Sequence, residues 1–61
     1  MAKRLRLVRF ISPFGSPAWM SPERARQLLE ADDRLWLEHQ QGGTLSDAQR
    51  RIGAPRIETA P

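Results

Sequence analysis

Hydrophobic and basic residues alternate near the start of the chain, in the run KRLRLVRFI at residues 3–11. Alternation with a period of two is typical of a β-strand that has one covered face. On that register Val8 and Phe10 share one face, and Arg9 lies on the other. The pattern predicts a basic N-terminal strand or extended segment over residues 1–11.

The run SPFGSP follows this segment. Its two Ser-Pro steps and its glycine favour turns, which predicts a loop over residues 12–20. The loop carries two aromatic side chains, Phe14 and Trp19. Large aromatic residues in a loop are well suited to contact another protein, so both are candidate interface residues.

The run Ser-Pro-Glu at residues 21–23 has the features of a helix start. Serine caps the first turn, proline suits the first helical position, and glutamate favours the positive end of the helix dipole. The glycine pair at residues 42–43 is typical of a helix end. These signals predict a main helix over residues 21–41.

Apolar positions within this helix recur with helical spacing and form one stripe, with Asp32 near its middle. The stripe consists of Ala25, Leu28, Leu29, Leu35, Trp36 and His39. A helix with one apolar stripe and little to cover it usually needs a binding partner. We therefore predict that a second copy of the chain, forming a homodimer, or another protein binds along this stripe. A lone carboxylate there is costly unless it is paired or solvated, so Asp32 is expected to meet an arginine.

A second interpretation ends the helix at Ala31 and makes residues 32–33 a turn. Residues 34–38 would then be a strand of a β-β-α-β unit, with residues 18–20 as its middle strand. We favour the continuous helix, because the apolar spacing persists across the two aspartates and no Gly or Pro interrupts it.

A shorter helix is predicted over residues 44–53. Thr44 and Asp47 stand in a T-x-x-D cap arrangement, and Gly53 marks the end. Residues 54–61 leave no room for another helix and are predicted to be a flexible tail. Together the elements predict a single small α+β domain over residues 1–61, most economically as a dimer.

Positive charge is concentrated at the start of the 61-residue chain. The sequence has 10 basic and 7 acidic residues, for a net charge of +3. Four of the basic residues, and no acidic one, lie in the first ten: Lys3, Arg4, Arg6 and Arg9. Such a segment attracts phosphate or an acidic protein surface. The alternative is a solvated strand edge, where positive charge blocks aggregation.

Residue types needed for catalysis or metal binding are scarce. The chain has no cysteine, one histidine (His39) and no Gly-rich phosphate loop. A single histidine with scattered acids makes no ligand set or catalytic pair, so we expect no cofactor, no metal and no enzymatic activity. No apolar run is long enough to span a membrane or to form a signal peptide, which predicts a cytoplasmic protein without membrane contact.

Residues 44–59, TLSDAQRRIGAPRIET, resemble the first half of a helix-turn-helix. The resemblance implies that Ala48 and Ile52 face the core, Gly53 takes the turn, and a recognition helix begins at Arg56. It also implies DNA contacts by three arginines, which are Arg50, Arg51 and Arg56.

The order of a basic strand followed by two helices is similar to the ribbon-helix-helix family. The resemblance implies that paired strands of a dimer enter the major groove, with Arg4, Arg6 or Arg9 reading bases. Against it stand the long loop over residues 12–20 and Pro55, which would truncate the second helix.

The leading hypothesis is a small non-enzymatic binding protein that acts through its helix and its aromatic loop. In style it resembles the short, Arg-rich accessory proteins of bacteriophages and mobile elements, which modulate a host protein or serve as minor structural parts. The rival hypothesis is a small nucleic-acid-binding regulator. A DNA binder loses affinity steeply with salt. A protein binder instead loses affinity when Leu28 or Trp36 is replaced, and it is largely indifferent to competing DNA.

Overall fold

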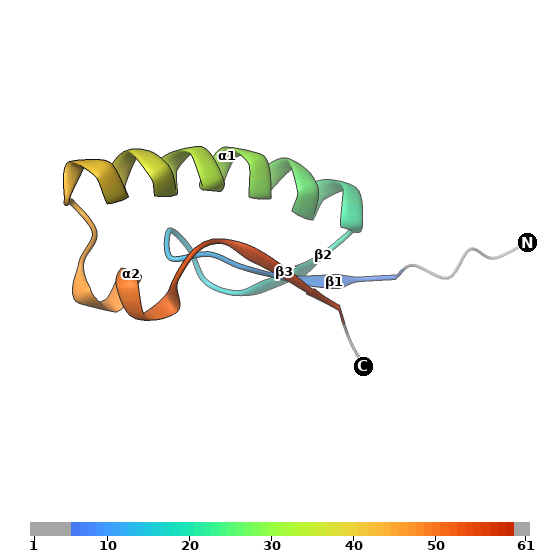
Figure 1. Ribbon diagram of the computed structural model, residues 1–61. Helices are drawn as coiled ribbons and strands as arrows, with labels where there is room; N and C mark the ends of the chain where they lie inside the picture. Colours follow the sequence, from blue (N-terminus) through green and yellow to red (C-terminus); the bar gives the residue numbers. More distant parts are fainter. Residues whose placement is uncertain (1–5, 60–61) are drawn as a thin grey trace, which may run out of the picture.

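A computed structural model describes residues 6–59. In chain order the elements are β1 (Val8–Ile11), β2 (Ala18–Met20), α1 (Pro22–Gly42), α2 (Asp47–Ile52) and β3 (Arg56–Thr59). The strands form an antiparallel sheet in the order β2-β1-β3, and α1 lies along one face of it (Figure 1). The predicted small α+β class with a long and a short helix is confirmed.

The first strand, β1, is the central strand of the sheet. Phe10 lies opposite Ala18 of β2 and Ile57 of β3, so each edge of β1 has a partner. Val8 and Phe10 are buried and Arg9 is exposed. The predicted alternation therefore holds over residues 8–10 and ends at Ile11, which is buried as well.

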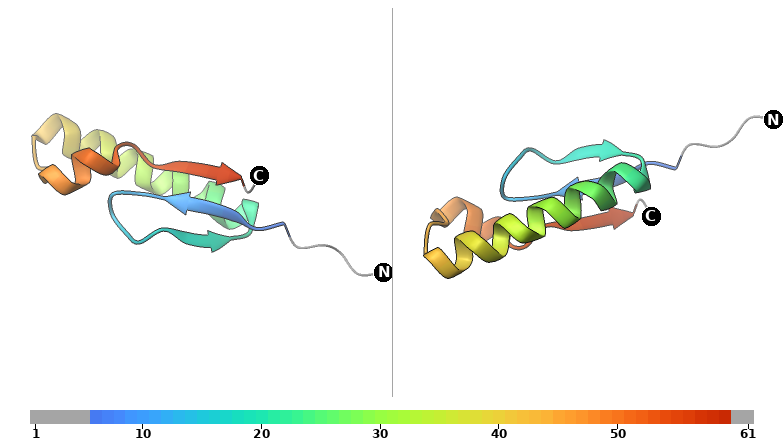
Figure 2. Two further views of the ribbon diagram at one scale, coloured as in Figure 1. Left: turned by 90° about the horizontal axis from the view of Figure 1, so that it is seen from below. Right: turned by 90° about the horizontal axis from the view of Figure 1, so that it is seen from above.

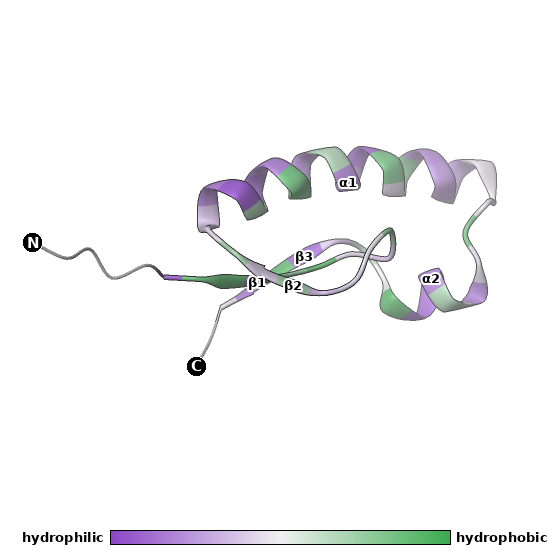
Figure 3. Cartoon of the chain, turned by 180° about the vertical axis from the view of Figure 1, so that it is seen from behind, coloured by the Kyte–Doolittle hydropathy of each residue, from purple (hydrophilic) through white to green (hydrophobic). Residues whose placement is uncertain are grey.

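The core is small and lies between β1 and the N-terminal half of α1. Val8, Phe10 and Ala25 form its buried centre. Four partly buried side chains surround that centre, namely Met20, Leu28, Leu29 and Ile57. Figure 3 shows the corresponding hydrophobic positions along β1 and as repeated bands on α1.

Helix α1 is continuous and capped at both ends, which confirms the predicted main helix to within one residue. The Ser21 hydroxyl accepts a hydrogen bond from the Arg24 N–H at 3.2 Å, and Gly43 ends the helix with a φ of 68°. The alternative strand at residues 34–38 is wrong. Asp32 is only half-buried in the uninterrupted helix, so its carboxylate does not require a break at this position.

Helix α2 begins later than predicted, because Ser46 rather than Thr44 is its cap. The Ser46 hydroxyl accepts from the Gln49 N–H at 3.2 Å, and the Gln49 side chain accepts from the Ser46 N–H at 2.9 Å. This is a reciprocal capping box. Thr44 belongs instead to the end of α1, since its N–H donates to the His39 carbonyl at 3.0 Å.

Residues 56–59 were predicted to lie in a flexible tail, and this prediction is wrong. They form β3, in which Ile57 lies opposite Phe10 and packs on the core. The predicted recognition helix starting at Arg56 is wrong for the same reason. The implied inward positions of Ala48 and Ile52 are also wrong, because both are exposed.

Two further expectations about the strands need correction. Residues 18–20 belong to β2 rather than to a loop, and β2 is an edge strand rather than the middle strand of the alternative interpretation. A ribbon-helix-helix arrangement needs a free edge on the basic strand. Here β2 and β3 already occupy both edges of β1, which leaves none for a second copy.

Replacing Gly43 with alanine is expected to lower the free energy of unfolding by about 1 kcal/mol, because a Cβ atom disfavours positive φ. No heavy atom would crowd that Cβ, so the cost is conformational. The matched control is Gly15→Ala, at an equally open glycine without positive φ. Urea denaturation followed by circular dichroism measures both variants, and equal stabilities would contradict this account of the helix end.

Candidate functional site

Around Arg9 and Trp19 the face of the sheet opposite α1 is uncovered by the rest of the described chain, whereas Ile11, which alternation places on the same face opposite Arg56, is only 8% exposed. Seen from that side, the strands lie in front of α1 with no other element over them (Figure 2, left). Trp19 and Leu7 are 55% and 49% exposed. We call this surface the open face and define it by five residues: Arg9, Trp19, Arg56 and Glu58 of the strands, and Leu7, which the alternation of β1, continued by one residue, places on the same side.

A row of three side chains crosses the middle of the open face. Arg9 of β1 lies opposite Trp19 of β2 on one side and Glu58 of β3 on the other. Cross-strand partners have Cβ atoms about 5 Å apart and project to the same face of the sheet. The row therefore places an arginine and an exposed tryptophan at directly paired positions on the same face of the sheet.

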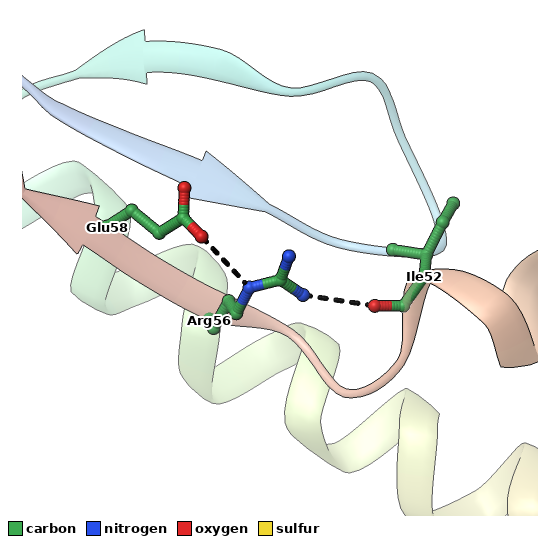
Figure 4. A network of polar contacts seen from close by, with 3 residues as sticks. All are labelled: Ile52, Arg56 and Glu58. Carbon is green, nitrogen blue, oxygen red and sulfur yellow. Dashed lines mark hydrogen bonds and ion pairs between the residues drawn. The ribbon is translucent and has the colours of Figure 1, made fainter.

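Glu58 is engaged by a different arginine. Arg56 Nε donates to Glu58 Oε2 at 3.3 Å, and Arg56 Nη1 donates to the Ile52 carbonyl at 3.0 Å (Figure 4). Arg56 thus joins the end of α2 to β3. Among residues 6–59 this is the only ion pair, so Arg9 has no ion-pair partner there.

The predicted helix stripe is only partly available to a partner. Ala25 is 0% exposed, because this chain's own sheet covers it, and Leu28 and Leu29 pack on the same core. Ala25 therefore cannot contact a second copy in the predicted homodimer interface. Leu35 is 40% exposed. Asp32 is half-buried and has no ion-pair partner within the described residues, so its pairing with an arginine across an interface stays a prediction.

Two residues from the candidate interface meet at the far end of α1. The rings of Phe14 and His39 lie 5.4 Å apart at an interplanar angle of 41°. His39 Nδ1 also forms a hydrogen bond with the Thr44 hydroxyl. His39 thus links the end of α1 to Thr44 and to the loop that holds Phe14.

The predicted nucleic-acid-binding arginines do not form one patch. The segment before β1, which holds Arg6, and helix α2, which holds Arg50 and Arg51, lie at opposite ends of the described structure (Figure 1). Lys3 and Arg4 lie outside the described residues. Arg9 and Arg56 lie on neighbouring strands of the open face, and Arg56 also reaches the end of α2, whose last turn holds Arg50 and Arg51.

Sequence reasoning missed two residues of the open face, Leu7 and Glu58. The alternating pattern of the first strand carried a signal for Leu7, since it places this residue on the same face as Arg9. No signal was present for Glu58, because residues 54–61 were interpreted as a tail.

Within residues 6–59, His, Asp and Glu side chains form no group of three that could hold a metal ion. None of the helices there combines the length and the apolar composition needed to cross a membrane. Comparison with family models, curated proteins and solved structures finds no significant match. The function must therefore be argued from the chain's own surface.

Proposed function

We propose that this chain is a small non-enzymatic binding protein, of the accessory type found in bacteriophages and mobile elements. It acts by protein–protein contact, either modulating a host protein or serving as a minor structural component. The observation that carries the proposal is the open face, where Trp19 is 55% and Leu7 49% exposed. The cytoplasmic location stays a prediction.

Physical chemistry favours the open face over the helix stripe as the interface. Tryptophan and arginine are the residues that most often dominate binding energy when an interface buries them. Trp19 and Arg9 are neighbours here, and neither is used by the core or by an ion pair within the described residues. The partner that fits this pair is a protein surface with an apolar pocket next to a carboxylate.

Single-stranded nucleic acid is the second candidate ligand for the same face. A base can stack on an exposed indole, and a nearby guanidinium can contact the phosphate backbone. Trp19 beside Arg9 on an uncovered sheet face provides both groups. Only two arginines lie on this face and Arg56 is already paired with Glu58, so a protein ligand is favoured.

The test is capture of binding partners from a host lysate by immobilised Trp19→Ala protein, compared with the unaltered chain. Loss of a buried anchor costs about 2 kcal/mol or more, so the dissociation constant should rise by about 30-fold or more, and capture at a bait concentration near the original constant should fall clearly. The matched control is Leu37→Ala, at an equally exposed (56%) apolar residue on α1. Its capture should be unchanged.

Three outcomes separate the hypotheses. A captured protein that is lost with Trp19→Ala and retained with Leu37→Ala supports the proposal. Capture that disappears after nuclease treatment and falls steeply with salt identifies nucleic acid instead. If Trp19→Ala captures the same protein as strongly as the unaltered chain, the open face is not the interface.

A further inference from the structure

A cleft lies between the C-terminal half of α1 and α2, and no residue of the open face lines it. Its volume is about 300 Å³. Six residues line it: Trp36, His39, Gln40, Gly43, Leu45 and Arg50. A volume of this size is at the lower end of the range for small-molecule sites, and it suits a group about as large as one aromatic ring.

One part of the cleft is apolar and held in place. Leu45 is 8% exposed and Trp36 is half-buried, so both offer fixed apolar surface. The His39 ring is fastened on two sides, by its hydrogen bond to Thr44 and by its contact with Phe14. Walls that are already fixed reduce the ordering that a ligand must impose, which favours binding.

The other part of the cleft carries a positive charge. Arg50 is exposed on α2 and has no ion-pair partner among residues 6–59. The nearby end of α1 brings a partial negative charge, but two of its carbonyls are already occupied. The Gly43 N–H donates to the Gln40 carbonyl at 3.3 Å, and the Thr44 N–H donates to the His39 carbonyl at 3.0 Å. The Arg50 guanidinium is therefore the dominant charge at the cleft.

We propose that this cleft binds a small apolar carboxylic acid. The apolar body packs against Trp36 and Leu45, and the carboxylate meets the guanidinium of Arg50. A planar guanidinium matches a carboxylate with two parallel hydrogen bonds, which a neutral amide in the same position does not reproduce. The acid is either a free small molecule or the last residue of a peptide chain. This site is independent of the open face and of the proposed function.

The test uses three ligands that share a phenyl group on a three-carbon chain and carry an anionic, a neutral or a cationic head group: phenylpropionate, phenylpropanamide and phenylpropylamine. Backbone amide NMR shifts of the full chain report where each one binds. We expect phenylpropionate to bind with a dissociation constant on the order of 1 mM, as is typical of so small a ligand. It should shift resonances around Trp36, Leu45 and Arg50 and bind about five- to tenfold more tightly than the amide.

Arg50→Gln should reduce phenylpropionate binding to the level of the amide, while the amide itself binds as before. The matched control is Arg51→Gln, at the next residue of α2, which does not line the cleft. N-acetylphenylalanine separates the two sources, because its acylated amine mimics a chain end. Tighter binding of N-acetylphenylalanine than of phenylpropionate assigns the site to a peptide terminus, and the reverse assigns it to a free acid.

Several results would overturn the proposal. Equal affinity for the acid and the amide would show that Arg50 does not bind the carboxylate. Unchanged binding of the acid by Arg50→Gln would show the same. Tightest binding of phenylpropylamine would show that the dipole of α1 and the Trp36 ring select a cation. Shifts confined to Leu7 and Trp19 would place the ligand on the open face.

Discussion

Replacing Phe10 with alanine is expected to remove most of the stability of this chain. Phe10 is 5% exposed, in the middle of the central strand, and it is the largest of the three residues at the centre of the core. Deleting a buried phenylalanine side chain costs about 3–5 kcal/mol, because apolar burial is lost and a cavity remains. A chain of this size has a total stability of about 3–9 kcal/mol. The variant should therefore be partly or wholly unfolded at room temperature.

Urea denaturation followed by circular dichroism and tryptophan fluorescence measures this effect. The matched control is Phe14→Ala, at the other phenylalanine, which is half-buried beside His39 rather than part of the core cluster. Its loss of stability should be clearly smaller. If Phe10→Ala unfolds at the same urea concentration as the unaltered chain, the core does not lie between β1 and α1.

Local sequence signals predicted the elements that local interactions form. The serine and proline before α1 and the glycine after it fixed the main helix, since caps act within one turn. The alternation at the start of β1 separated the inward Val8 and Phe10 from the outward Arg9, because α1 covers one face of the sheet. Both predictions depended on nothing distant in the chain.

The predictions that failed depended on distant partners. Four residues of β3 carry little signal of their own, and they become a strand only because the free edge of β1 and the core accept Ile57. The cap of α2 was ambiguous in a similar way. Thr44 and Ser46 each begin a cap pattern, and Ser46 is used because Thr44 already bonds to the end of α1.

The candidate site was likewise predictable only where local sequence signals determine it. Trp19 was predicted as a contact candidate because it lies in a segment rich in Pro and Gly, where a large aromatic side chain is well suited to contact another protein. The residues that neighbour Trp19 on the sheet could not be predicted from the local sequence pattern. Arg9 lies between Trp19 and Glu58 only after β2 and β3 are paired with β1. Ala25 was assigned to an interface because no local signal shows that Val8 and Phe10 of β1 pack against this part of the helix.

Truncation of the chain after Pro55 is expected to abolish cooperative unfolding. The truncated chain lacks β3, so β1 loses one of its two partners and the core loses Ile57. A two-stranded hairpin against one helix is near the limit of what folds alone. Thermal unfolding followed by circular dichroism should show a broad, non-cooperative change instead of a sigmoidal one. Removal of residues 60–61 alone is the control and should leave the transition intact.

A point substitution separates the role of the β3 side chains from chain length. Ile57→Asp places a charge against the core and should cost about 2–4 kcal/mol, because the carboxylate has no partner there. Ile52→Asp makes the same change at an isoleucine that is 41% exposed on α2, and it should cost less than about 1 kcal/mol. If both variants and the truncated chain unfold like the unaltered protein, residues 56–59 are a tail after all. The sheet would then have two strands, and Arg9 would lack the Glu58 neighbour that completes the row on the open face.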